Sequence, residues 1–179
     1  MPIKQFLKKD KKWYERYVNF ANHNELEYLD IPFDMKKFEK KIKFKISHKQ
    51  SFVEYSPIAA KYLKTIINKI KLNDGGILII DYAYIEKEMK NTLQAVSKHK
   101  YCNILKNFRN SDITYNLNFS LINMITKQFG PCSSIFTTQK KFLTKLGILD
   151  RAEILAKNMP FSQKADIYFR IKRLIDEKQ

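Results

Sequence analysis

The sequence predicts an α/β protein, and three adjacent stretches carry this prediction. Residues 57–70 hold an apolar stripe at helical spacing, the pair Gly75–Gly76 ends that helix, and the apolar run Ile77–Ile80 follows at once. Such a run is typical of a strand buried on both faces of a parallel sheet. Asp81 stands at its carboxyl end, where open α/β sheets bind their ligands. Helix, glycine turn and buried strand together make one unit of an α/β sheet.

The first fifty residues are expected to be rich in β-structure. The alternating stretch KWYERYVNF, with IKQFLK before it and the turn-like KKDKK between them, predicts a β-hairpin, and NELEYLDI is placed as its continuation. Residues 34–49 contain many lysines and few apolar side chains, which finish in alternation at Phe44 and Ile46. We expect a solvated strand and turn there, with a surface for nucleic acid or an anionic membrane as the alternative.

After Asp81 the sequence loses a clear period until residues 117–130, where apolar spacing predicts a helix. A short strand is expected at residues 133–138, then helices at residues 138–147, Asp150–Asn158 and Ser162–Glu177. Taken together, the chain is predicted as one partial domain over residues 1–179. Its parts are a β-rich insertion (1–50), the second half of a Rossmann-like sheet (51–149) and C-terminal helices (150–179).

Composition favours a folded domain in the cytoplasm. The chain has 179 residues, 44% of them hydrophobic, which is enough for one core. Five of its 34 basic residues are arginine and the rest are lysine, and the net charge is +16. Lysine excess of this kind favours compositional drift over dedicated nucleic-acid binding, although its field attracts anionic surfaces non-specifically. No apolar run is long enough to span a membrane, and Cys102 and Cys132 are isolated, as in a reducing compartment.

Several common kinds of site are missing from the sequence. The four glycines form no GxG turn of the kind that lets a backbone approach a nucleotide or S-adenosylmethionine. A P-loop is also absent, no Ser-His-Asp spacing is convincing, and the three histidines are too scattered to predict a zinc site. On its own residues, the chain has the pattern of the later half of an α/β domain.

Four stretches then carry a family resemblance: GGILIIDYAY, NTLQAVSKHK, SDITYNLNF and TTQKKFLTKLGI. In order and spacing they resemble motifs of the MidA-like methyltransferases, the S-adenosylmethionine-dependent family that includes the mitochondrial complex I assembly methyltransferase. Upstream, FVEYSPIAAKYL resembles the family's "vEisPaa" helix start, and residues 1–6 resemble the tail of its strand "NEFFDALPIRQF". The resemblance implies the C-terminal half of a methyltransferase-type Rossmann sheet, with a β-hairpin insertion and a helical C-terminus. It places the glycine-rich cofactor motif in an N-terminal half that these residues do not include.

The resemblance also marks candidate residues for the substrate side of a pocket. Asp81 and Tyr82 match "DYG", with Ala83 in place of the glycine, whereas Asn118 stands where the family has the aspartate of "VDF". Its other matches in this sequence are Thr92, Leu93, Gln94, His99, Asp112, Thr114 and Gln139. The residues themselves leave plainer roles open, because Asp81 could cap a loop, His99 could be solvated, and Asp112 with Thr114 could form a turn.

The sequence therefore predicts a fragment of a class I methyltransferase, for which the family implies protein arginine methylation. No residue is assigned as catalytic or as a metal ligand. S-adenosylmethionine is expected as a cofactor only if a separately encoded N-terminal half complements the chain, which alone should be inactive. The expected partners are that half, a protein substrate and, non-specifically, anionic surfaces. The alternatives are a non-enzymatic basic binding protein and a decayed gene product without a selected role.

Overall fold

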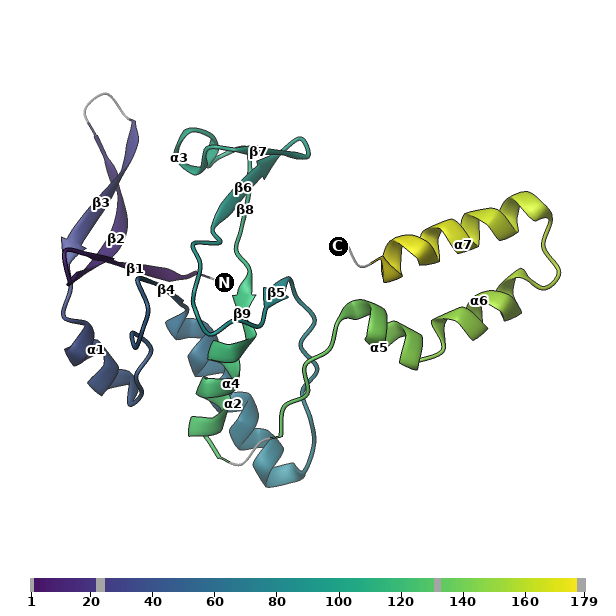
Figure 1. Cartoon of the computed structure of the whole chain (residues 1–179), viewed down its shortest axis with the longest axis horizontal. Helices are drawn as coiled ribbons and strands as arrows, with labels where there is room; N and C mark the ends of the chain where they lie inside the picture. Colours follow the sequence, from purple (N-terminus) through teal and green to yellow (C-terminus); the bar gives the residue numbers. More distant parts are fainter. Residues whose placement is uncertain (1, 22–24, 131–132, 177–179) are drawn as a thin grey trace. The chain divides into compact units, whose positions relative to one another are not determined.

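The structure is a computed structural model that describes residues 2–21, 25–130 and 133–176. The chain forms two compact units, residues 1–132 and residues 133–179 (Figure 1). Strands and helices both contribute, so the predicted α/β class is confirmed. The boundaries predicted for the three parts of the chain stay a prediction.

A four-stranded antiparallel sheet with the strand order β3-β2-β1-β4 opens the first unit. The predicted hairpin and its third strand are therefore confirmed. Asp10 and Lys11 make the tight turn between β1 and β2, and both have positive φ (46° and 63°), as a two-residue hairpin turn requires. The four strands are β1 (Lys4–Lys9), β2 (Lys12–Phe20), β3 (Leu26–Pro32) and β4 (Phe52–Tyr55).

The strand and turn expected in residues 34–49 are wrong, because this stretch begins with a helix, α1 (Met35–Ile42). Asp34 caps it by accepting a hydrogen bond from the backbone N–H of Lys37 at 2.9 Å. Met35, Phe38 and Ile42 recur at helical spacing and contribute to the hydrophobic core, while the lysines between them stay exposed. The helical period was therefore present but carried by only three apolar side chains.

The predicted helices around residues 57–70 and 117–130 are confirmed as α2 (Pro57–Asn73) and α4 (Phe119–Gln128), which pack against each other. Ser56 caps α2 by accepting a hydrogen bond from the N–H of Ala59 at 3.1 Å. The two helices share one core with the sheet and α1. Its buried members are Phe6, Met35, Ile46, Val53, Tyr55, Ala60, Leu63, Ile67, Leu121 and Ile125.

The strand expected at Ile77–Ile80 is wrong: these residues are irregular, and most of them are exposed. Parallel pairing begins only after them, between β5 (Ala83–Tyr84) and β9 (Leu117–Asn118). A buried strand needs a neighbour on each side, and the described residues provide none beside this run. The remaining elements of the first unit form a small antiparallel sheet with an adjoining helix: β6 (Gln94–Ser97), β7 (Lys100–Cys102), α3 (Ile104–Asn107) and β8 (Asp112–Thr114).

The second unit is helical, as predicted, with α5 (Gln139–Lys145), α6 (Ile148–Ala156) and α7 (Phe161–Ile175). Thr138 caps α5 through its side-chain oxygen, which accepts from the N–H of Lys141 at 3.3 Å. The short strand expected at residues 133–138 is wrong, since this stretch is irregular and Ile135 is exposed. Glu177, the final residue of the predicted last helix, lies outside the described residues.

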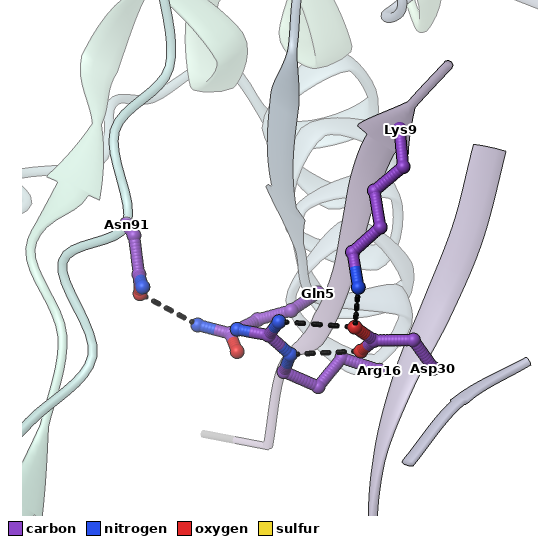
Figure 2. Close-up of polar contacts among 5 residues, drawn as sticks. All are labelled: Gln5, Lys9, Arg16, Asp30 and Asn91. Carbon is purple, nitrogen blue, oxygen red and sulfur yellow. Dashed lines mark hydrogen bonds and ion pairs between the residues drawn. The ribbon is translucent and has the colours of Figure 1, made fainter. Parts of the chain in front are cut away.

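An ion-pair cluster lies on the antiparallel sheet (Figure 2). The carboxylate of Asp30 on β3 accepts hydrogen bonds from Arg16 Nε at 2.9 Å, Arg16 Nη2 at 3.2 Å and Lys9 Nζ at 2.8 Å. The hydrogen bond from Arg16 is the largest cause that lowers the pKa of Asp30, from 3.8 to about 2; burial opposes it and Lys9 assists it. The cluster therefore joins three strands through one carboxylate.

We expect Asp30→Asn to lower the free energy of unfolding by roughly 1 kcal/mol at pH 7, because the amide loses the charge that Arg16 and Lys9 neutralise. The pKa of Asp30 is lower in the folded chain than in the unfolded chain. The advantage of the wild type is therefore complete above about pH 4 and is lost as the pH falls toward 2. Urea unfolding between pH 7 and pH 2 measures the difference in unfolding free energy between the wild type and Asp30→Asn. Glu27→Gln, at an exposed position of the same strand, is the control. A difference that stays constant down to pH 2 would contradict the assignment.

Candidate functional site

A cavity of about 230 Å³ lies in the first unit between α2, the segment 77–81, the β5–β9 pair and α4. Most of its wall is aliphatic or aromatic, which is typical of a ligand pocket. Glu54 and Asp81 are the two carboxylates of the wall. The lining residues are Glu54, Ser56, Ala59, Tyr62, Leu63, Ile66, Ile77, Ile79, Asp81, Tyr84, Tyr115, Asn116, Leu117, Asn118, Leu121, Ile122 and Ile125.

Glu54 is a buried carboxylate that hydrogen bonds hold in place. It is 7% exposed and accepts from Gln5 Nε2 at 2.9 Å, from the backbone N–H groups of Thr92 and Leu93 at 3.1 and 3.3 Å, and from Thr92 Oγ1 at 2.5 Å. Hydrogen bonds to a charged acceptor are stronger than those between neutral groups. Four donors from β1 and the 92–93 loop thus compensate the charge that β4 buries.

Two side chains extend this network from Glu54 to neighbouring segments. The amide of Gln5 donates its second hydrogen to Asn91 Oδ1 at 3.0 Å, and Figure 2 shows the two side chains facing each other. The hydroxyl of Thr92 accepts a hydrogen bond from the backbone N–H of Asn116 at 3.0 Å. One hydrogen-bond network therefore joins β1, β4, the 91–93 loop and Asn116, which directly precedes β9.

Asp81 and Tyr115 form the second polar group of the pocket. Asp81 is exposed, and its Oδ1 accepts a hydrogen bond from the backbone N–H of Tyr82 at 2.8 Å. Burial raises the pKa of the Tyr115 phenol, and the negative charges of Asp81 and Glu54 raise it further. The phenol therefore stays protonated at neutral pH and offers a hydrogen-bond donor beside two carboxylates.

Asn118, predicted as a pocket residue, lines the cavity and also caps α4. Its Oδ1 accepts from the N–H of Leu121 at 2.8 Å, and its Nδ2 donates to the carbonyl of Glu86 at 3.1 Å. Because both ends of the amide have partners, Asn118 connects α4 to the segment after β5. An aspartate here would keep the cap but lose the donor to Glu86.

The other predicted residues do not line this cavity. Tyr82 is exposed, and its carbonyl accepts from the N–H of Leu117 at 2.9 Å. His99 is an exposed turn residue between β6 and β7 with φ of 62°. Asp112 and Thr114 lie on β8, where the hydroxyl of Thr114 accepts from Gln94 Nε2 at 3.2 Å. Gln139 belongs to the second unit, in which its Nε2 donates to the carbonyl of Leu174 at 2.7 Å.

Sequence reasoning overlooked Glu54, Gln5 and Tyr115. The signal for Glu54 was the acid within the strand sequence FVEYSP, since a carboxylate in a buried strand must find donors. Across the described ranges 2–21, 25–130 and 133–176, no group of three or more histidine, cysteine, aspartate or glutamate side chains could hold a metal ion. In the same ranges no helix is both long and apolar enough to cross a membrane.

An apolar, acid-bearing cavity beside a parallel strand pair is the kind of place where α/β proteins bind small ligands. The family model described as "Putative S-adenosyl-L-methionine-dependent methyltransferase" matches residues 1–136, and the chain belongs to this family. The resemblance found in the motifs is therefore confirmed.

Named relatives agree with this assignment. The chain is 27% identical over 157 residues to the "Protein arginine methyltransferase NDUFAF7 homolog, mitochondrial" of Caenorhabditis elegans. The aligned region covers 84% of this chain and 36% of the relative. It is 30% identical over 103 residues to the mitochondrial protein arginine methyltransferase NDUFAF7 of Xenopus tropicalis, covering 58% of this chain and 24% of the relative. The chain thus spans about a third or less of these relatives.

Two solved structures from Burkholderia thailandensis share the fold. An uncharacterized protein of the COG1565 superfamily matches with a TM-score of 0.75 and 21% identity, over 100% of this chain and 49% of that one. A second member of the superfamily, bound to S-adenosyl-homocysteine, matches with a TM-score of 0.74 and 20% identity. This match covers 100% of the present chain and 47% of the solved chain. The present chain therefore corresponds to about half of each solved chain.

We expect Glu54→Gln to lower the free energy of unfolding by about 2 kcal/mol, because the amide loses the charge and turns an N–H group toward existing donors. Urea unfolding measures this, with Glu86→Gln as the matched control. The side chain of Glu86 is exposed and, among the residues that the structure describes, pairs with Lys90, so its replacement should change stability by less than about 0.5 kcal/mol. If both variants lose the same free energy of unfolding, the hydrogen bonds around Glu54 stabilise the fold no more than an exposed ion pair does.

Proposed function

We propose that the first unit forms the acceptor-binding side of a protein arginine methyltransferase. In this proposal the cavity takes the guanidinium group of a substrate arginine. Family membership supports methyl transfer from S-adenosylmethionine as the reaction class, and the names of the two curated relatives support arginine as the acceptor.

The charge of the cavity is the observation that carries this proposal. The chain has a net charge of +16, yet none of the residues that line the cavity is lysine or arginine, and Glu54 and Asp81 are acidic. A cationic group is attracted to the negative charge of such a site, whereas an anionic group is repelled by it. An apolar wall around these charges suits the methylene stem of arginine.

The two acids have different parts in this proposal. Glu54 already accepts four hydrogen bonds, so we assign it to holding the wall together. Asp81 is exposed at the cavity and is the carboxylate to which a planar guanidinium would donate. Tyr115, kept protonated, would orient the acceptor through its hydroxyl.

The cofactor side is proposed to come from a polypeptide segment outside these 179 residues. A methyltransferase of this type needs glycines where the backbone approaches the cofactor. Gly75 and Gly76 do not fit that role, because a Cβ added at either would meet open space, not the wall of a cradle. Alone, the chain is therefore expected to bind the acceptor group but to transfer no methyl group.

Titration of the full chain with ethylguanidinium, followed by NMR, tests the acceptor site. We expect saturable shifts in the amides of residues 81–84 and 115–118, and at least tenfold weaker binding of neutral, nearly isosteric ethylurea. Asp81→Asn should weaken ethylguanidinium binding at least fivefold, whereas Glu88→Gln, exposed and outside the cavity, should leave it unchanged. Equal binding of the two compounds, or an unaffected Asp81→Asn variant, would exclude the proposed site.

A non-enzymatic basic surface is the second candidate, and α1 is the observation that favours it. Lys36, Lys37, Lys40 and Lys41 are exposed along this helix, while its acid, Glu39, accepts hydrogen bonds from Ser47 and Ile46 instead. Replacing these four lysines by glutamine should lower the salt concentration at which the chain leaves a heparin column. Four replacements elsewhere, at Lys140, Lys141, Lys145 and Lys157, serve as the control. Equal effects would assign retention to net charge alone.

A further inference from the structure

The segment Ile77–Ile80 is apolar on both sides and lacks the partners that such a segment needs. Ile77 and Ile79 line the cavity, whereas Leu78 and Ile80 alternate with them and are 67% and 72% exposed. Within the ranges that the structure describes, no hydrogen bond reaches the backbone of residues 77–80. Figure 1 shows the segment as coil leading from α2 to β5. Four consecutive apolar residues with free backbone groups are a template for strand pairing.

No basic residue near this segment protects it from pairing; the charges that flank it are those of Asp74 and Asp81. Exposed strand edges in monomeric proteins are usually blocked by charges, lysine above all. Here the stretch Leu72–Glu86 contains neither lysine nor arginine, although 34 of the 179 residues are basic. An unprotected apolar segment in an otherwise lysine-rich chain is what a buried interface requires.

The chain continues from this segment directly into a parallel pair. Ala83 and Tyr84 of β5 lie in register with Leu117 and Asn118 of β9. If Ile77–Ile80 formed a strand, it would therefore extend the existing β5–β9 sheet. Pairing would also place side chains of the added strand beside Leu78 and Ile80, which are exposed in this chain.

We infer that Ile77–Ile80 becomes a strand by pairing with an apolar β-strand of a polypeptide that carries the rest of the methyltransferase fold. This inference rests on the proposed function and identifies the surface through which the cofactor side joins the acceptor side. The match of the whole chain to only 49% of a solved chain indicates that the complete fold has a further half to supply such a strand. A second copy of this chain is a poorer occupant, because two chains of charge +16 repel each other.

Photo-crosslinking identifies the occupant. The tagged full chain carrying Leu78→p-benzoylphenylalanine is produced in cells of its source organism and irradiated, and the crosslinked peptide is sequenced. Ile154→p-benzoylphenylalanine is the matched control, because Ile154 is 68% exposed and lies in the second unit. We expect an adduct at least tenfold above the control. Its partner should match the same methyltransferase family in the part that this chain does not span.

Hydrogen exchange on the purified adduct then tests pairing itself. The amides of residues 77–80 should exchange at least tenfold more slowly in the adduct than in the chain alone, because a strand ladder protects them. Three results would overturn the inference: an adduct with a second copy of the chain, an adduct yield no higher than that of the control, or amides of residues 77–80 that exchange at the same rate in the adduct as in the chain alone. Ethylguanidinium binding to the chain alone separates the two proposals: if it persists when pairing fails, only the inference about the strand is wrong.

Discussion

The buried carboxylate of Glu54 is the group on which the rest of the first unit depends. Burying a carboxylate is costly unless donors compensate it, and here they come from Gln5 on β1 and from Thr92 and Leu93. Glu54 and its donors come from three stretches that resemble family motifs. Gln5 lies in IKQF, Glu54 in FVEYSP, and Thr92 with Leu93 in NTLQ. The structure thus gives these motifs a shared physical reason, because they meet at one hydrogen-bonded charge that supports the cavity wall.

Prediction from sequence succeeded where one local signal was strong. Ser56 before Pro57 and Thr138 before Gln139 marked the starts of α2 and α5, and apolar spacing marked α4. It failed for α1, whose three apolar side chains were diluted by lysine, and for β6 to β8, which are too short for a period to emerge. The run Ile77–Ile80 has the composition of a buried strand, but a strand also needs neighbours, and composition does not supply them.

The candidate site was predicted in part for similar reasons. Asp81 lies two residues before β5 and Asn118 is the last residue of β9, so both reach the cavity through the parallel pair. The importance of Glu54 depends on donors that lie 38 and 49 residues away along the chain, which no local pattern contains. His99 and Gln139 matched motifs equally well, yet their positions, a hairpin turn and a contact with Leu174, follow from local packing.

Charge is distributed unevenly along the chain, and the cavity follows that distribution. Two stretches that supply much of its wall, residues 72–86 and 110–126, contain no lysine or arginine, while α1 carries four exposed lysines. Residues 17–35 lack lysine and arginine as well, so stretches of this kind are not confined to the cavity. At the cavity, their absence leaves the negative charge of Asp81 without a basic side chain in the surrounding wall.

The hydrogen bonds around Glu54 also bear on how the first unit folds. They join residues separated by 49, 38 and 39 positions, and Thr92 extends the network to Asn116, 24 positions further on. Contacts between residues this far apart require large loops to close, which costs chain entropy before any contact repays it. We therefore expect the cavity wall to assemble late, after hairpin β1–β2 and helix α2 have formed from neighbours in sequence. A nascent chain can complete this cavity only once residues up to Ile125 are available.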